Sequence, residues 1–116
     1  MSKRTDRVSE LIKREVGRIL IREIKDPKLQ FVTITSVKVS PDLKYSRIYY
    51  TIMGDASQRE LTQQKLDHAC GFMRSQIGKN LSLRYVPELK FYYDEVADYA
   101  ANVERLLRDI KKGEDE

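Results

Sequence analysis

The sequence has very few of the residues that build disulfides and metal sites. It contains one cysteine and one histidine among 116 residues, and no tryptophan. A single cysteine excludes a disulfide within the chain, and one cysteine with one histidine falls short of the ligands of a structural zinc site. No apolar run approaches the roughly 20 residues of a membrane span, and the basic start lacks the apolar segment of a signal peptide. We therefore expect a cytoplasmic protein with no membrane partner, no metal and no cofactor.

Patterns of catalytic residues are also missing. His68 and Cys70 stand two positions apart, so on a helix their side chains point to different sides and cannot act as a pair. The aspartates are scattered without a partner pattern, and no glycine-rich phosphate loop is present. We predict that the protein is not an enzyme and has no catalytic residues.

The composition is typical of one folded domain with an uneven charge. Hydrophobic residues make up 41% and charged residues 34% of the chain, which favours a globular protein over a disordered one. We expect a single RNA-binding domain over residues 1–112 and a flexible acidic tail over residues 113–116. Residues 1–93 carry 18 Lys and Arg against 10 Asp and Glu, whereas residues 94–116 carry 4 against 8. A basic body with an acidic end indicates binding to a polyanion, although charges that only keep a small domain soluble would look similar.

Hydrophobic periodicity predicts an α+β fold. Helical spacing predicts a first helix that ends near Ile24, a second that begins at Asp55 or Ser57, a third to about Leu81, and a fourth from Glu95 to Lys112. We expect Gly113 to end the last helix. Strands are predicted over residues 31–39, 45–53 and 88–93.

The first two predicted strands are joined by a short turn, so they should pair as an antiparallel hairpin. The alternation of the first strand slips at Thr35–Ser36, where we expect a bulge. The predicted order of elements is therefore α-β-β-α-kink-α-β-α.

A glycine interrupts the helical pattern at position 71. A glycine within a helix costs about 1 kcal/mol relative to alanine, so we expect either a break in the helix or the close approach of another backbone. A helix that begins after such a break would offer free amides to a phosphate, and basic residues follow it at Arg74, Lys79 and Arg84. Alternatively, Gly71 only relieves a steric clash against the sheet while Arg74 reaches into solvent.

Basic residues form a stripe along the first predicted helix. The stripe consists of Arg7, Arg14, Arg18 and Lys25, with Arg4 and Arg22 beside it. Its four members fall within about 60° on a helical wheel, so they could follow the phosphates of a nucleic acid. Glu10 and Glu15 lie on the same helix, and an ordinary solvated face is the alternative.

The chain has seven tyrosines, of which Tyr49 and Tyr92 fall on the outward faces of predicted strands. Such tyrosines could stack on nucleic-acid bases. They could equally lie at the edge of a small core with their hydroxyls in water.

Several motifs, taken in order, resemble the bacterial ribosome-binding factor A family, which has a type II KH-like fold. These motifs are Arg4-x-x-Arg7-Val8, Asp26-Pro27-Lys28-Leu29, Val37-x-Val39-Ser40-x-Asp42-Leu43, Ala69-Cys70-Gly71-Phe72-Met73-Arg74 and Leu83-Arg84-x-x-Pro87-Glu88-Leu89-x-Phe91-x-x-Asp94. The resemblance covers residues 4–110 and implies α-β-β-α-kink-α-β with a C-terminal helix, the three-stranded sheet packed on helices. It also implies that Ala69-x-Gly71 replaces the GXXG loop with which ordinary KH domains clamp nucleic acid.

The resemblance further implies a non-catalytic ribosome assembly factor. Such proteins bind the free small (30S) ribosomal subunit and its 16S rRNA late in maturation, support processing of the 16S 5′ end, matter most in the cold, and leave with help from a small GTPase. We expect a monomer whose RNA-binding residues are Arg7, Arg14, Arg18, Arg22, Lys25, Ala69, Gly71, Arg74, Lys79 and Arg84. The alternatives are a generic KH-like RNA-binding module and a protein-interaction module, neither with a ribosomal role.

Overall fold

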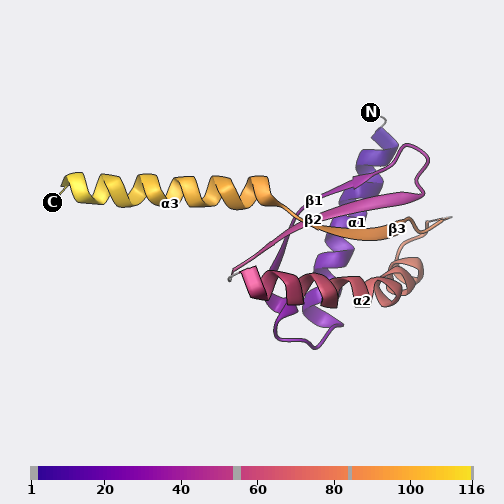
Figure 1. Ribbon diagram of the computed structural model, residues 1–116. Coiled ribbons are helices and arrows are strands. Elements are labelled where there is room, and N and C mark those ends of the chain that lie inside the picture. Colours follow the sequence, from indigo (N-terminus) through magenta and orange to yellow (C-terminus); the bar gives the residue numbers. More distant parts are fainter. Residues whose placement is uncertain (1–2, 54–55, 84, 116) are drawn as a thin grey trace.

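The computed structural model describes residues 3–53, 56–83 and 85–115 and shows long helices around a three-stranded sheet (Figure 1). The elements in chain order are α1 (Lys3–Arg22), the short 3-10 helix η1 (Leu29–Phe31), β1 (Val32–Val39), β2 (Tyr45–Ile52), α2 (Ala56–Asn80), β3 (Glu88–Tyr93) and α3 (Glu95–Asp115). The predicted α+β class, with its sheet packed on helices, is confirmed. The alternative helix start at Asp55 lies outside the described residues.

The sheet has the strand order β1-β2-β3. β1 and β2 are antiparallel, as the hairpin prediction required, and β3 runs parallel to β2. The register of β1 shifts between Ile34 and Ser36, which confirms the predicted bulge. Because the extra residue restores the alternation, Ile34 opposite Tyr50 and Val37 opposite Ile48 share one face of the sheet.

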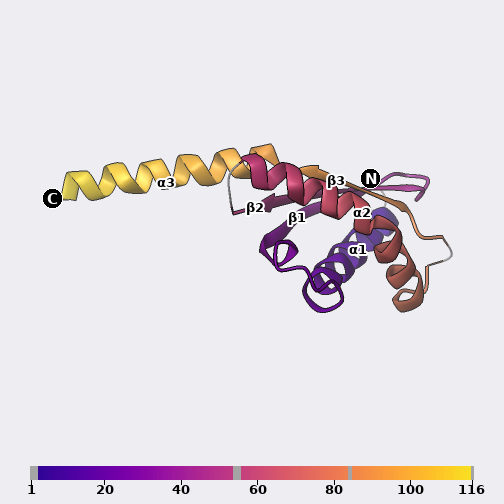
Figure 2. The same cartoon turned by 60° about the horizontal axis from the view of Figure 1, so that its bottom comes forward.

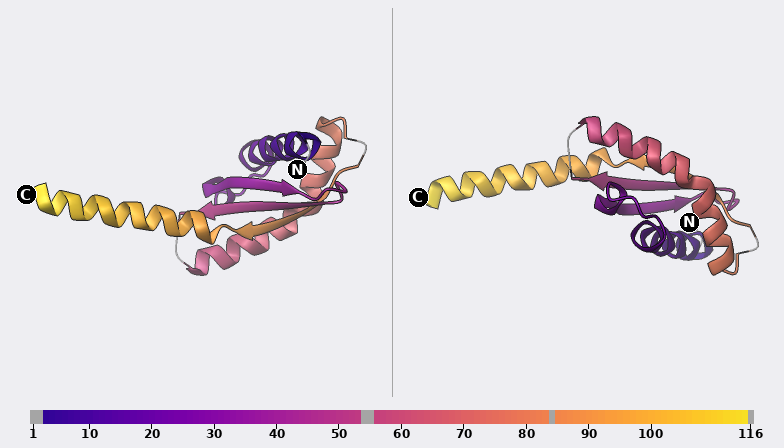
Figure 3. Two further views of the ribbon diagram at one scale, coloured as in Figure 1. Left: turned by 90° about the horizontal axis from the view of Figure 1, so that it is seen from above. Right: turned by 90° about the horizontal axis from the view of Figure 1, so that it is seen from below.

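Both α1 and α2 cover that same face of the sheet. The right panel of Figure 3 shows α1 along β1 and α2 along β3, and the left panel shows the other face of the sheet uncovered. The core lies between the helices and the sheet. Its buried members are Val8, Ile12, Val16, Ile19, Leu20, Leu29, Val37, Ile48, Tyr50, Leu66, Met73, Ile77, Leu89 and Phe91.

The predicted break at Gly71 is wrong. α2 is one continuous helix from Ala56 to Asn80, so the helix expected to begin after Gly71 is the second half of α2. Its axis bends partway along, as Figure 2 shows, and the expected corner is therefore a bend within one helix. No helix N-terminus lies between residues 57 and 80. The free backbone amides that were predicted to bind a phosphate at Gly71 are therefore absent.

Two helix ends also differ from the sequence prediction. α1 ends at Arg22 instead of near Ile24, because the amides of Glu23 and Ile24 both donate to the Ile19 carbonyl, at 2.9 and 3.0 Å. α3 continues through Gly113 to Asp115, so Gly113 does not end it. A glycine ends a helix only when the backbone turns there, and here the chain carries on in helical geometry.

α3 begins at the end of β3 and projects away from the sheet (Figure 1). Asp94 caps it: its Oδ1 accepts a hydrogen bond from the Ala97 amide at 3.0 Å, and its Oδ2 lies 2.6 Å from the Thr35 hydroxyl. The hydrogen bond from Thr35, and after it that from the Ala97 amide, lowers the pKa of the Asp94 carboxyl. The cap fixes where the helix leaves the body, next to Thr33 and Thr51 at one end of the outer face of the sheet.

Candidate nucleic-acid interface

α1 presents a basic outer face because its apolar side is fixed against the sheet. The buried residues of α1 are Thr5, Val8, Ile12, Val16, Ile19 and Leu20. Their burial leaves Arg7, Arg14 and Arg22 exposed on the other side of the helix. Lys25 is also exposed but lies beyond the helix end. The predicted stripe thus exists along α1 up to Arg22.

Arg18 lies on this helix but is held by two carboxylates. Its Nη2 is 2.6 Å from Glu15 Oε1, and its Nη1 is 3.1 Å from Glu23 Oε1. The bond to Glu15, and after it that to Glu23, raises the pKa of Arg18. Because these carboxylates offset its charge, Arg18 attracts a phosphate less strongly than Arg7 and Arg14 do.

Glu15 also connects α1 to the end of α2. The Asn80 side-chain amide donates to Glu15 Oε1 at 2.7 Å. Hydrogen bonds from Arg18 and Asn80 lower the pKa of Glu15, although burial opposes them. The contact places Lys79, which precedes Asn80, at the end of α2 that meets the basic face of α1.

The other predicted residues of α2 do not join this surface. Arg74 donates from Nη2 to the Val86 carbonyl at 3.0 Å, on the β3 side of the helix. At about 100° per residue, Arg74 and Lys79 lie roughly 140° apart around α2. Ala69 is half-buried against the core, whereas Gly71 is exposed. The predicted single surface of α1 and α2 is therefore reduced to α1 with Lys79, and Arg84 lies outside the described residues.

A second basic group, which sequence reasoning missed, lies on the outer face of the sheet. Lys38, Arg47 and Lys90 are register partners across the three strands. The sequence contains a signal for the first pair, since the hairpin register follows from the turn. Whether Lys90 joins this pair depends on the register between β3 and β2, which the sequence does not specify.

Position 71 does not require glycine on steric grounds. A Cβ added there meets no atom within 4 Å, and the same holds for Gly17 in α1. The predicted close approach of another backbone is therefore wrong, as is the alternative of a clash against the sheet.

We expect Gly71→Ala to raise the free energy of unfolding by about 0.5–1 kcal/mol, because alanine is the better helix former. Gly17→Ala is the matched control, with the same expected gain, and urea denaturation measures both. If Gly17→Ala raised the free energy of unfolding and Gly71→Ala lowered it, the bend of α2 would require glycine.

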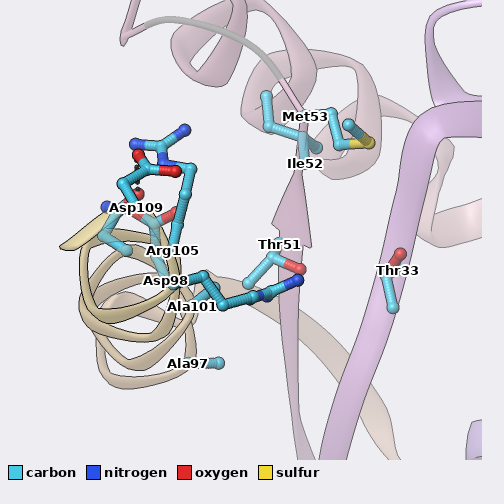
Figure 4. A pocket seen from close by; sticks show the side chains of 11 residues that line it. Thr33, Thr51, Ile52, Met53, Ala97, Asp98, Ala101, Arg105 and Asp109 are labelled. Atoms are coloured by element: carbon cyan, nitrogen blue, oxygen red, sulfur yellow. Dashed lines mark hydrogen bonds between the residues drawn. The ribbon is translucent and has the colours of Figure 1, made fainter. Parts of the chain in front are cut away.

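The pockets and titrating groups of the described residues contain no catalytic arrangement. The pocket in Figure 4, of about 610 Å³, lies between the strand residues Thr33 and Thr51 and the α3 residues Asp98 and Arg105, and it includes no nucleophile paired with a base. Burial raises the pKa of the Cys70 thiol to about 11, so it stays protonated and unreactive at neutral pH. Over residues 3–53, 56–83 and 85–115, no group of three or more His, Cys, Asp or Glu could hold a metal ion. No helix within those ranges is long and apolar enough to cross a bilayer.

Comparison with known proteins agrees with the fold and gives the family. The family model for ribosome-binding factor A matches residues 4–107. The ribosome-binding factor A of Syntrophobacter fumaroxidans is 42% identical over 114 residues, which are 97% of each chain. The solution NMR structure of a Thermotoga maritima protein, provisionally assigned as ribosome binding factor A, is 32% identical with a TM-score of 0.68, covering 79% of this chain and 88% of that one.

A further similar structure comes from Thermus thermophilus. It is a ribosome binding factor A homology model fitted into the cryo-EM map of a 30S complex, with a TM-score of 0.62 and 20% identity over 72% of this chain and 88% of that one. At this identity the likeness concerns the fold. The sequence and family matches cover nearly the whole chain. The chain therefore belongs to the ribosome-binding factor A family, whose members are ribosome-binding factors and not enzymes.

Proposed function

We propose that this protein is an assembly factor that binds the free 30S subunit by contacting 16S rRNA. The observation that carries the proposal is the family match over residues 4–107. Two others support it: the Thermus thermophilus relative was fitted into a map of a 30S complex, and α1 carries an exposed row of arginines. A folded rRNA offers the dense phosphate charge that such a row attracts.

In the proposed mechanism α1 binds phosphates and reads no bases. Arg7, Arg14 and Arg22 contact the backbone of folded rRNA, and Lys79 extends the contact from α2. Contacts to phosphate fix position and orientation without sequence information, and double-stranded RNA is recognised mostly by shape. The protein would thus stabilise an immature arrangement of the rRNA until it can rearrange.

We also propose when the protein acts and what helps it to leave the subunit. The protein acts as a monomer in the cytoplasm, late in maturation, and supports processing of the 16S 5′ end. Its role is largest in the cold, where misfolded RNA rearranges slowly. It leaves before translation, with help from an assembly GTPase. A strain without the gene should then accumulate 16S rRNA with an unprocessed 5′ end, more at low than at high temperature.

Pelleting with purified ribosomal particles tests the binding step directly. The protein is mixed with equal concentrations of free 30S subunits or whole 70S ribosomes and centrifuged. We expect it in the pellet with 30S subunits, in amounts that fall steeply with salt, and much less with 70S ribosomes. Equal recovery with both particles would contradict binding to the free subunit.

A further inference from the structure

The outer face of the sheet carries a row of three cations. Lys38 of β1 lies opposite Arg47 of β2, and Arg47 is the register partner of Lys90 of β3. All three are exposed. Among the residues that the structure describes, none of the three forms an ion pair with a carboxylate.

Such a row is unfavourable for the isolated protein. Like charges directly opposite each other on neighbouring strands destabilise a sheet. The acidic groups nearby are Glu88, the first residue of β3, and Asp94, which interacts electrostatically with Lys38 but also accepts hydrogen bonds from Thr35 and the Ala97 amide. A bound polyanion would remove the repulsion among the three cations.

Two tyrosines occupy the next row on the same face. Tyr49 and Tyr92 are register partners, and their ring centroids lie 5.7 Å apart with an interplanar angle of 31°. The Lys38 ammonium lies 5.9 Å from the Tyr49 centroid, and that of Lys90 lies 5.7 Å from the Tyr92 centroid. Each ring therefore stands beside a cation. We call Lys38, Arg47, Lys90, Tyr49 and Tyr92 the outer-face cluster.

We propose that the outer-face cluster binds single-stranded RNA, with one or two unpaired bases stacked on Tyr49 and Tyr92 and the adjoining phosphates beside the row of cations. Aromatic rings next to positive charge are the two parts that single-strand binding requires. Other RNA-binding domains likewise stack bases on aromatic side chains of a sheet.

The pattern favours a single strand over a duplex. The bases of a duplex are stacked on one another and paired, so they cannot stack on side chains of a flat sheet. The cluster faces away from α1, because α1 and α2 cover the opposite face. It would thus add a second RNA contact to the one proposed for α1, and it does not depend on the ribosomal role.

Fluorescence anisotropy with a labelled RNA of ten unpaired nucleotides tests the proposal. Replacing both rings, Tyr49→Leu with Tyr92→Leu, should weaken binding at least fivefold. The pair Tyr49→Phe with Tyr92→Phe keeps the rings and should bind within about twofold of wild type. Tyr99→Leu on α3, where the side chain is 71% exposed, is the matched control and should change nothing.

Two further measurements separate stacking from a loss of structure. Lys38→Gln with Lys90→Gln should lower the slope of log K against log salt by about 1.4, since each phosphate contact on a single strand contributes roughly 0.7. The chain has no tryptophan, so Tyr92→Trp provides a single reporter whose fluorescence the RNA should quench. Circular dichroism verifies that each variant is folded.

The proposal is overturned if the folded leucine variant binds the ten-nucleotide RNA as tightly as wild type. It is also overturned if the same sequence annealed as a duplex binds equally well and equally sensitively to the tyrosine changes. Because the probe is isolated RNA, a negative result leaves the binding of 30S subunits open. Conversely, if the protein does not pellet with 30S subunits, the anisotropy experiment with isolated RNA still tests the outer-face cluster.

Discussion

Reversing two charges on α1, Arg7→Glu with Arg14→Glu, will weaken binding to free 30S subunits by about 100-fold at physiological salt. Both side chains are exposed, so the fold should persist. Each lost phosphate contact is expected to cost about tenfold, equivalent to roughly 1.4 kcal/mol. Filter binding over a salt series measures the effect, and the slope of log K against log salt should fall by about 2.

The matched control for this pair is Arg105→Glu with Arg108→Glu on α3. These residues are also exposed, and the change in net charge is the same. If α1 makes the contact, the control loses much less affinity. Equal losses in the two double variants would mean that only the total charge matters, and the assignment of the interface to α1 would be dropped.

Ile12→Ala will destabilise the protein by about 2–5 kcal/mol, the range for removing a large aliphatic side chain from a packed core. Ile12 is 0% exposed and lies in the core between α1 and the sheet. The total free energy of unfolding of a small domain is only about 5–15 kcal/mol, so the variant should unfold at a much lower urea concentration. Urea denaturation followed by circular dichroism measures the change.

Ile21→Ala is the matched control, because it removes the same side chain from the same helix. Ile21 is 67% exposed, and substitutions of exposed residues usually change stability by less than about 0.5 kcal/mol. A large loss of stability in Ile21→Ala, or a small loss in Ile12→Ala, would contradict the orientation of α1 and with it the position of the basic face.

The elements of the fold were predictable where local chemistry decides them. The slip in alternation at Thr35–Ser36 located the bulge, and the short turn after β1 identified the hairpin. The prediction failed at Gly71, where a local cost of about 1 kcal/mol does not break the helix. Leu66 and Met73, on either side of Gly71, are both buried in one core. Packing of this kind outweighs the propensity of a single residue.

The candidate site was predictable only along one helix. The exposed face of α1 follows from its apolar periodicity, and Arg7 and Arg14 lie where the wheel places them. The pairing of Arg18 with Glu15, three positions away on the same helix, is the kind of local pair that sequence spacing can indicate. The hydrogen bond between Glu15 and Asn80, which is 65 positions along the chain, could not be predicted. The row that ends at Lys90 depends on parallel pairing between distant segments, and no local pattern encodes that register.

Sedimentation of a cell extract through a sucrose gradient tests the central claim most directly. The protein is followed by immunoblot at its natural level, beside markers for free subunits, whole ribosomes and polysomes. We predict that it migrates with free 30S subunits and is absent from translating ribosomes. Migration as a free protein, together with binding of purified protein to 16S rRNA no tighter than to duplex DNA, would contradict a role in assembly of the small subunit.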